Sequence, residues 1–362
     1  MIKRLLLFLL VALALAGCLE SPGSLPTPAV PPERLTPLPG WVTPTPGENP
    51  VQIYFTSPGD ENAGSRALEQ ALVADINAAR ERIDMAMYNF SLRPVADALI
   101  TAHRRGVAVR LVVDSDALDG TQLSRLLSAG IPVIGDRREG LMHNKFIIVD
   151  EALLWTGSLN LTGSGTYNDN NNMARILSPD LAQNYRIEFE EMFTGDQFGA
   201  NSPADTPNPR VTLPGGVVVE NYFSPDDGVS PRLVDLVEEA QTSVDFLAYS
   251  FTSDPLADAL LERYQAGVSV RGVFDENSYR SNTGGEYLRL QRAQMNVRLD
   301  GNPNLMHHKV IVIDRQTVVL GSYNFTRAAD RTNDENVLVI HDPAVAAAYL
   351  LEFEALYSQA AP

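Results

Sequence analysis

The apolar positions of the chain fall into short continuous runs that alternate with longer segments of helical spacing. The runs that predict strands in the first half are VQIYF from Val51, IDMAMY from Ile83 and VAVRLVV from Val107. Between the first two runs, Leu72, Ile76 and Ala79 recur every three or four residues and predict an amphipathic helix. A further helix is expected after Pro94. Alternating strands and helices predict an α/β fold, with a sheet flanked by helices.

The second half repeats this order of elements. Its strands are VVENYF from Val218, VDFLAY from Val244 and VSVRGVF from Val268. The pairs Asp84 and Asp245, Tyr88 and Tyr249, and Gly106 and Gly267 are all separated by the same distance along the chain. A long helix is expected at the end of each half, from Leu181 and from Val345. A duplication of this length predicts two lobes of similar fold.

Polar segments mark the loops and boundaries between these units. The run ENSYRSNTGGE, from Glu276, predicts a loop by its glycine, asparagine and serine content. Residues 196–209 contain three prolines and predict the connector between the lobes. The predicted domains are therefore a first lobe at 51–200 and a second lobe at 210–362.

The N-terminal residues predict a targeting segment and a tether. Two basic residues precede an apolar run from Leu5 to Ala16, which is too short for an ordinary transmembrane helix. The run leads into Leu-Ala-Gly-Cys, which resembles the lipobox of bacterial lipoproteins and implies cleavage before Cys18 and acylation of this cysteine. Residues 1–17 are then a signal peptide and residues 18–50 a proline-rich linker. The expected location is the cell envelope, outside the cytoplasm, anchored to a membrane through Cys18.

Composition and charge narrow the classes of function. The 362 residues are 44% hydrophobic and 20% charged, which is typical of globular domains with a sizeable core. The formal net charge is −17, so the protein repels a long polyanion unless a local basic cleft overcomes that field. This disfavours a nuclease without excluding one. Cys18 is the only cysteine, and no internal disulfide can form.

One motif occurs once in each half. HNKFIIVDEALLWTGSLN, from His143, returns in the second half as HHKVIVIDRQTVVLGSYN, from His307, and both copies read H-x-K-x4-D-x6-G-S-x-N without a gap. A histidine and a lysine two apart on a strand project from one face. Phosphodiester cleavage needs a nucleophile, an acid for the leaving alkoxide and positive charge on the phosphate oxygens. Two copies of the motif supply this set.

The motif resembles the HKD motif of the phospholipase D superfamily, and the resemblance covers both halves of the chain. It implies two lobes packed as a pseudo-dimer, with the two motifs facing each other across one active site. It also implies a phosphodiesterase in which one histidine attacks phosphorus, while the other protonates the leaving alcohol and then activates water. The implied catalytic residues are His143, Lys145, His307 and Lys309.

Other motif positions are expected to support this chemistry. The expected donors to the phosphate oxygens are Ser158, Ser322, Asn160 and Asn324. Gly157 and Gly321 are expected to let the backbone approach the phosphate. Asp150 and Asp314 end the buried strands, and for these we expect a structural role rather than a catalytic one.

The two halves differ at one equivalent position past the motif histidines, where the second half has Glu335 and the first has Asn171. Some nuclease-like relatives have a glutamate here that hydrogen-bonds the far nitrogen of the histidine. The resemblance therefore pairs Glu335 with His307, and Asn171 with His143. A carboxylate raises the pKa of an imidazole more than an amide does. Because the acid must start protonated and the nucleophile neutral, this pairing favours His143 as the nucleophile and His307 as the acid.

The remaining candidate residues carry less chemistry. His103 is expected on a solvated helix face, His308 pointing away from the site, and His341 in a loop past a strand. Tyr88 and Tyr249 are expected in the core or on the floor of the cleft. None of these histidines has the spacing of a metal cluster, so neither a metal nor another cofactor is predicted.

These patterns favour a lipid-anchored phospholipase D-type phosphodiesterase that hydrolyses phospholipid headgroups. The tether and the negative charge favour a phospholipid or membrane surface as the partner. The alternatives are a metal-independent endonuclease acting on nucleic acid, a cardiolipin synthase-like phosphatidyl transferase, and an envelope binding protein that has kept the phosphate pocket. No obligate protein partner is predicted.

Overall fold

The computed structural model describes residues 50–59 and 62–361. These residues belong to the larger of two compact units, Arg34–Pro362. The predicted signal peptide, Cys18 and nearly all of the proline-rich linker therefore lie outside the described residues.

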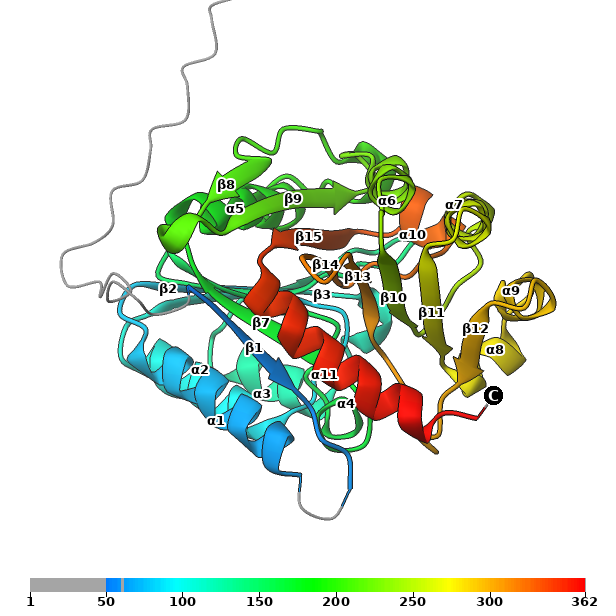
Figure 1. Ribbon diagram of the computed structural model, residues 1–362. Helices are drawn as coiled ribbons and strands as arrows, with labels where there is room; N and C mark the ends of the chain where they lie inside the picture. The colour runs from blue at the N-terminus through cyan, green and yellow to red at the C-terminus, as the bar shows by residue number, and fades with distance from the viewer. Residues whose placement is uncertain (1–49, 60–61, 362) are drawn as a thin grey trace, which may run out of the picture. The chain divides into compact units, whose positions relative to one another are not determined.

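The first lobe is built on a seven-stranded mixed sheet (Figure 1). Its strands are β1 (Val51–Phe55), β2 (Arg82–Met87), β3 (Ala108–Val113), β4 (Val133–Gly135), β5 (Lys145–Val149), β6 (Leu153–Gly157) and β7 (Asn172–Leu177). They follow the spatial order β1-β7-β6-β5-β2-β3-β4, in which β2, β3 and β4 are parallel and the other neighbours antiparallel. The motif strand β5 thus lies at the centre, held by a neighbour on each side.

The second lobe repeats this sheet and adds one strand. Its strands are β8 (Arg210–Thr212), β9 (Val218–Ser224), β10 (Ser243–Ala248), β11 (Ser269–Phe274), β12 (Asn296–Leu299), β13 (Lys309–Ile313), β14 (Thr317–Gly321) and β15 (Glu335–His341). The order is β12-β11-β10-β13-β14-β15-β9-β8, so the second motif strand, β13, occupies the place of β5.

Helices lie on both faces of each sheet, as the alternation of elements predicts. They are α1 (Ala63–Ala78), α2 (Arg93–Arg104), α3 (Thr121–Ser128), α4 (Gly163–Tyr167), α5 (Pro179–Phe193), α6 (Val229–Glu238), α7 (Asp254–Gln265), α8 (Glu276–Ser281), α9 (Tyr287–Arg292), α10 (Arg327–Arg331) and α11 (Pro343–Gln359). Helices α1 to α3 form one apolar core with the outer face of the first sheet, and α6, α7 and α9 form another with the second sheet.

A third apolar core joins the lobes. It contains α5, α11 and the inward residues of both sheets. Helix α11 of the second lobe contacts β1 of the first, and α5 of the first contacts β9 of the second (Figure 1). Along β5, Phe146 and Ile148 enter this shared core while Ile147 and Val149 face the outer one, as a strand buried on both faces requires. The two lobes therefore form one pseudo-dimer rather than two independent domains.

The predicted loop ENSYRSNTGGE is partly helical. Its first six residues form α8, because the carboxylate of Asp275, just before the run, accepts the backbone N–H of Ser278 at 2.6 Å. Such a cap outweighs the weak helix preference of asparagine and serine. Residues 282–286 lie outside the helices, and Gly284 there has a φ of +77°.

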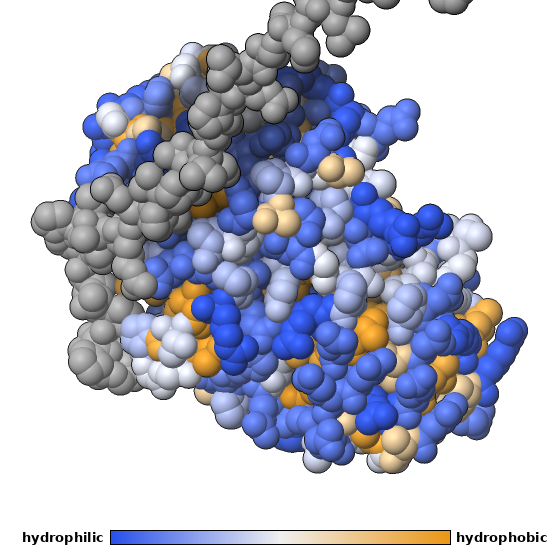
Figure 2. All heavy atoms as spheres, turned by 90° about the horizontal axis from the view of Figure 1, so that it is seen from above, coloured by the Kyte–Doolittle hydropathy of each residue, from blue (hydrophilic) through white to orange (hydrophobic). Residues whose placement is uncertain are grey.

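The surface of the described residues is largely polar. The face shown in Figure 2 is mostly hydrophilic, and its apolar residues lie in small separate patches. The large apolar side chains that are exposed, Leu127, Leu288 and Leu351, belong to three different helices. Within residues 50–59 and 62–361, no helix combines the length and the apolar character needed to cross a bilayer.

Candidate active site

The residues at the start of each motif strand bind the opposite lobe. The backbone N–H of His143 donates to the carbonyl of Asp334 at 3.0 Å, and that of His307 donates to the carbonyl of Asn170 at 2.9 Å. A short β-bridge accompanies each of these bonds. Because each histidine is fixed by the backbone of the other lobe, the two motifs meet at the lobe interface.

Both motif lysine side chains are buried. The exposed fraction is 0% for Lys145 and 2% for Lys309. Each ammonium donates to the backbone carbonyl of its motif histidine at 2.8 Å and lies near a tyrosine ring, 5.0 Å from the centre of Tyr88 or 4.5 Å from that of Tyr249. No carboxylate among the described residues forms an ion pair with either ammonium. Since buried lysines are rare without a paired charge, these two leave positive charge available for an anionic phosphate.

The lowered pKa values of the two lysines also indicate a site for an anion. Burial lowers the pKa of Lys145 to about 7, although Glu335 and Asp114 act in the opposite direction. Burial and the charge of Lys145 lower the pKa of Lys309 well below its usual range. A phosphate anion in contact with them would favour both ammonium forms. The site is therefore suited to an anionic substrate.

Each histidine ring is held by a side chain from the other lobe. Nδ1 of His143 lies 2.7 Å from Oε2 of Glu335, and Nδ1 of His307 lies 2.9 Å from Oδ1 of Asn171. The predicted pairing within each lobe is wrong, because the partners are exchanged. The residue just before Glu335 or Asn171 already binds the backbone of the opposite motif, and this places the next side chain against the opposite histidine.

The bonds at Nδ1 leave Nε2 of each ring for chemistry. Nδ1 of His307 is also 3.1 Å from the carbonyl oxygen of Ser158, which can only accept, so Nδ1 carries the hydrogen. Burial and the charges of Lys145 and Lys309 lower the pKa of His143 well below its usual range. Burial, the same two lysines and His143 lower the pKa of His307. The two rings therefore sense the same positive charge and each other.

Glu335 lies at the centre of a buried hydrogen-bond network. Burial raises its pKa to about 7, although Lys145, Lys309 and hydrogen bonds from Ser322 and Asn333 partly oppose this. This carboxyl group therefore titrates near neutral pH, beside the ring of His143.

The motif serines do not face the phosphate as predicted. The hydroxyl of Ser158 donates to Oδ1 of Asn171 at 2.9 Å, and that of Ser322 donates to Oε2 of Glu335 at 2.7 Å. Both serines have an exposed fraction of 0%. A hydroxyl has one hydrogen to donate. The serines therefore orient the side chains that hold the histidines.

The motif asparagines and glycines differ in how they fit their expected roles. Asn160 and Asn324 are partly exposed, and the buried Oδ1 of each has no hydrogen-bond partner among the described residues, so they stay candidates for contact with the phosphate. A Cβ atom would come within 2.2 Å of a carbonyl oxygen of the neighbouring strand at Gly157, and within 2.1 Å at Gly321. The close approach of strands, not of phosphate, requires these glycines.

Comparison with known proteins identifies the family. The family model described as "Cardiolipin synthase, PLD-like domain" matches residues 72–193 and 233–357, one match in each lobe and more than half of the chain. The chain belongs to the phospholipase D superfamily. A phospholipase D of Rickettsia felis is 36% identical over 132 residues, which are 36% of this chain and 66% of that protein. Human mitochondrial cardiolipin hydrolase is 38% identical over 138 residues, 38% of this chain and 53% of that protein.

The chain matches slightly less than two thirds of the Rickettsia protein and about half of the human one. The crystal structure of phosphatidylserine synthase from Haemophilus influenzae is similar over 85% of this chain and 86% of that one, with a TM-score of 0.63 and 15% identity. At this identity the likeness shows the fold alone. The superfamily and the two-lobed α/β fold implied by the motif are thus confirmed.

Within this superfamily fold, the motif aspartates anchor turns. Asp150 accepts the backbone N–H groups of Arg80, Glu81 and Arg82, and Asp314 accepts those of Gln241, Thr242 and Ser243, all at 2.7–3.0 Å. Both aspartates follow a motif strand with φ of 50° and 51°, a left-handed conformation that aspartate tolerates. This geometry agrees with the structural role expected for them.

A layer of buried amides behind the motifs was missed from the sequence. Nδ2 of Asn336 donates to Asn144 at 2.8 Å, and Nδ2 of Asn172 lies 2.8 Å from Nδ1 of His308. His308 therefore points away from His143 and His307, as predicted. The sequence repeat could have identified these amides, because Asn172 and Asn336 are separated by the same number of residues as the two motif histidines.

Two further aspartates that sequence reasoning passed over hold the loops ahead of the motifs. Asp114 accepts the backbone N–H of Met142 at 3.2 Å, and Asp275 accepts that of Met306 at 2.8 Å. They occupy equivalent positions in the two copies of the repeat, which could have marked them. Each therefore fixes the residue that precedes a motif histidine.

The recurring tyrosines and the remaining histidines can now be placed. The rings of Tyr88 and Tyr249 lie 4.8 and 4.6 Å from the motif imidazoles, which fits the floor of the cleft. His103 lies on α2, partly buried. His341 ends β15 instead of lying in a loop, and its Nε2 is 3.0 Å from Glu220. No three histidine, cysteine, aspartate or glutamate residues of the described chain form a group that could hold a metal, and metal independence stays a prediction.

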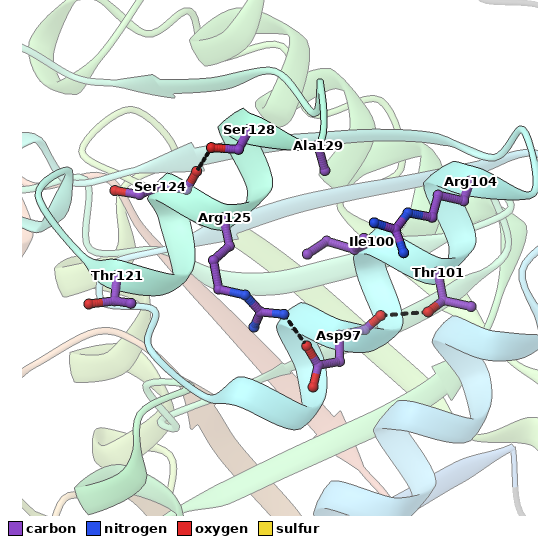
Figure 3. Close-up of a pocket in the computed structure, with 9 residues that line it drawn as sticks. All are labelled: Asp97, Ile100, Thr101, Arg104, Thr121, Ser124, Arg125, Ser128 and Ala129. Atoms are coloured by element: carbon purple, nitrogen blue, oxygen red, sulfur yellow. Dashed lines mark hydrogen bonds and ion pairs between the residues drawn. The ribbon is translucent and has the colours of Figure 1, made fainter.

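A groove between α2 and α3 lies apart from the motifs (Figure 3). Two arginines and several hydroxyl groups line it, and Arg125 is already paired with Asp97 at 2.5 Å. None of its lining residues belongs to either motif. The groove is therefore separate from the candidate site at the histidine pair.

Proposed function

We propose that the chain is a phospholipase D-type phosphodiesterase that hydrolyses phospholipid headgroups through a phosphohistidine on His143. One observation carries the proposal. Two buried lysines, without a carboxylate ion-pair partner among the described residues, flank two histidines that are held by Nδ1. These groups match what displacement at a phosphodiester needs.

In the first step, Nε2 of His143 attacks phosphorus and the bond from phosphorus to the headgroup oxygen breaks. The bound phosphate anion offsets the charges of Lys145 and Lys309 that lower the pKa of His307, and so favours its protonated form. Protonated His307 then gives its Nε2 proton to that oxygen, and the headgroup alcohol leaves. In the second step, Nε2 of His307 takes a proton from water, the water oxygen attacks phosphorus, and the bond from phosphorus to nitrogen breaks. Phosphatidic acid leaves, and His143 and His307 return to their starting states. Lys145 and Lys309 offset the charge on the nonbridging oxygens throughout.

The exchange removes the ground on which the sequence assigned these roles, because Glu335 lies beside His143 and not beside His307. A different argument supports the same assignment. Bonding to phosphorus makes the ring of His143 cationic, because Nδ1 keeps its proton, and Glu335 at 2.7 Å can compensate that charge. The acid must instead release a proton. A neutral amide such as that of Asn171 holds this proton less tightly than a carboxylate would. His143 is therefore proposed as the nucleophile and His307 as the acid.

A phospholipid is favoured over nucleic acid as the substrate. The net charge of −17 opposes a long polyanion, whereas a lipid surface can be reached through a tether. The names of the two relatives, phospholipase D and cardiolipin hydrolase, point in the same direction. A metal-independent endonuclease and a phosphatidyl transferase of the same superfamily are the alternatives.

We also propose that acylated Cys18 holds the protein on a cell-envelope membrane, outside the cytoplasm. The apolar run, the Leu-Ala-Gly-Cys sequence and the proline-rich linker support this, and they lie outside the described residues. Such a tether would keep a strongly negative enzyme close to its lipid substrate.

The test uses the full-length protein. Hydrolysis of bis(p-nitrophenyl) phosphate should persist in EDTA, should disappear in His143→Ala, and should be unchanged in the control His103→Ala on α2. On the same preparation at physiological salt, headgroup release should exceed plasmid nicking. Loss of activity in EDTA that a divalent ion restores would refute metal independence, and faster nicking would establish the endonuclease instead. An added alcohol that captures the phosphatidyl group in preference to water would identify a transferase.

A further inference from the structure

A cleft of about 620 Å³ opens at the lobe interface, on the α11 side of the second motif strand. From the first lobe it is lined by the loop after β1 (Thr56 to Gly59, with Asn62) and by residues 167, 168 and 170. From the second lobe it is lined by Gly301 to Asn304 and by one face of the end of α11. Its volume is in the range of small-molecule sites.

Because the chain is an internal duplication, this cleft can be compared with the equivalent region of the other motif copy, around Arg138. On the open side, Nδ2 of Asn302 donates to Asn168 O, to Asn170 Oδ1 and to Leu305 O. At the equivalent positions of the other motif copy, Arg138 donates to Thr332 O, to an oxygen of Asp334 and to Leu141 O. The same geometry is thus made by an ion pair on one side of the pseudo-dimer and by two neutral amides on the other.

The equivalent region, around the Arg138–Asp334 ion pair, is occupied by another segment of the chain. The connector between the lobes passes over it, with the ring of Phe198 5.8 Å from the guanidinium of Arg138 and the N–H of Gly199 donating to Asp334. A Cβ at Gly199, whose φ is +55°, would lie 2.4 Å from Arg138. Farther along the connector, Asp205 lies close enough to Glu191 of α5 to raise the pKa of that carboxyl group. At the position equivalent to Glu191, the open cleft has Ala355.

The lining of the open cleft is nearly neutral and rich in amides. Its side-chain amides are those of Asn62, Asn168, Asn170, Asn302, Asn304 and Gln359. Among the described lining residues only Glu352 is charged at neutral pH, and it already lies 3.3 Å from Nε2 of His308. The Oδ1 atom of Asn62 is buried and has no hydrogen-bond partner within residues 50–59 and 62–361. Pro58, Pro303 and Leu356 add apolar surface between these amides.

From this lining we infer that the cleft binds a neutral, hydroxyl-rich group, such as glycerol, inositol or a hexose. An amide both donates and accepts, so neighbouring amides can bind vicinal hydroxyls, while apolar side chains cover the C–H faces. The unpartnered Oδ1 of Asn62 is an acceptor for such a hydroxyl. Since the lining residues that the structure describes include no lysine, arginine or histidine, the cleft does not suit a second phosphate.

The cleft adjoins the proposed catalytic centre through one residue. Asn170 lines it, and the backbone carbonyl of Asn170 accepts the N–H of His307. The hydroxyl-rich group can therefore be part of a lipid headgroup or a free polyol. Only the first source rests on the proposed function.

The experiment measures binding separately from turnover. Saturation-transfer NMR and calorimetry on the full-length protein, in a detergent without a sugar headgroup, use glycerol, myo-inositol and glucose as probes. Ala355→Trp fills the cleft from α11 and should weaken binding at least about tenfold. Ala347→Trp, an exposed alanine on the same helix outside the cleft, is the matched control and should leave binding unchanged. Asn304→Ala, which removes one exposed amide, should weaken binding about fivefold.

Turnover then separates the sources. If Ala355→Trp lowers kcat/KM for phosphatidylinositol or phosphatidylglycerol vesicles but not for phosphatidylethanolamine, the bound group is a headgroup. If it abolishes polyol binding and changes no hydrolysis, the ligand is a free polyol. Absence of binding of all three probes by the parent protein and by Ala347→Trp overturns the inference, whatever the hydrolysis shows. Binding without hydrolysis of bis(p-nitrophenyl) phosphate upholds the inference and refutes the proposed phosphodiesterase.

Discussion

Replacing Glu335 by glutamine tests the exchanged pairing and the role of His143 together. The carboxylate is fully buried, and its Oε2 lies 2.7 Å from Nδ1 of His143. Glutamine keeps the size and an acceptor oxygen but removes the negative charge. If His143 becomes a phosphohistidine, the variant must form a cationic ring without a compensating anion.

The structure sets the size of the effect. Unit charges about 4 Å apart interact by about 4 kcal/mol at an effective dielectric constant of about 20. Because the amide oxygen of glutamine retains part of this as a hydrogen bond, we expect a loss of about 2–3 kcal/mol, or about 30- to 150-fold in the first chemical step. The pKa of Glu335 is about 7, so its ionisation should add a rise with pH to the parent rate, against the fall expected as Lys145, whose pKa is also about 7, loses its proton. The variant should lack that rise.

The assay is a quenched single turnover of bis(p-nitrophenyl) phosphate at several pH values, with nitrophenolate release and phosphorylated histidine measured together. Glu352→Gln is the matched control, because Glu352 lies beside His308, which faces away from the site. It should change the rate less than about threefold. If His143 were the acid instead, Glu335→Gln would spare the nitrophenyl ester, whose leaving group hardly needs a proton, and slow only alkyl esters. That result, or a phosphoryl group found on His307, would refute the assignment.

Four other outcomes follow from the structure and the sequence. His307→Ala should lower the hydrolysis rate of alkyl esters about 10²–10⁴-fold and that of nitrophenyl esters much less. Mass spectrometry of quenched reactions should show phosphohistidine accumulating on His143. Equal rate losses on the two kinds of ester would contradict an acid role. Cys18→Ser should release the protein from membranes after a carbonate wash, and continued sedimentation would exclude the lipid anchor. Asp150→Ala, which removes the acceptor for three backbone N–H groups, should cost about 2–4 kcal/mol in urea unfolding, and no change in midpoint would disprove its turn-anchoring role. Burial and the nearby carboxylates of Asp205, Asp226 and Asp227 raise the pKa of Glu191 from 4.5 to about 9. Because the folded state then holds this proton more tightly than the unfolded state, the stability of the fold should decrease as pH rises from about 5 to 9. Glu191→Gln should reduce this decrease, measured as the melting temperature at each pH.

The sequence predicted the fold because duplication and strand patterning are local signals. The strands around each motif are continuous apolar runs, and the motif strands lie at the centres of the two sheets as such runs require. Helix α8 was missed because its cap, Asp275, lies one residue outside the polar run that predicted a loop. A single side chain changed the local preference there.

The errors at the site share another cause. A fixed spacing links Glu335 to His307 along the chain, but the contact with His143 depends on how the lobes face each other. No pattern within one lobe contains that information. The serines were misassigned for a similar reason, because donors that suit a phosphate also suit the amide or carboxylate beside them, and only the geometry shows that Ser158 and Ser322 donate to Asn171 and Glu335.

The exchange of partners also explains why two nearly identical motifs can take different roles. In a symmetric pair of lobes both histidines would have the same partner, and only the bound substrate could make one a nucleophile and the other an acid. Here Glu335 faces His143 and Asn171 faces His307, so the two rings differ before any substrate binds. A charged partner stabilises the ring that gains positive charge on bonding to phosphorus, while a neutral partner eases release of the proton by the other. If His143 is the nucleophile and His307 the acid, as proposed, this difference at equivalent positions gives the site a direction.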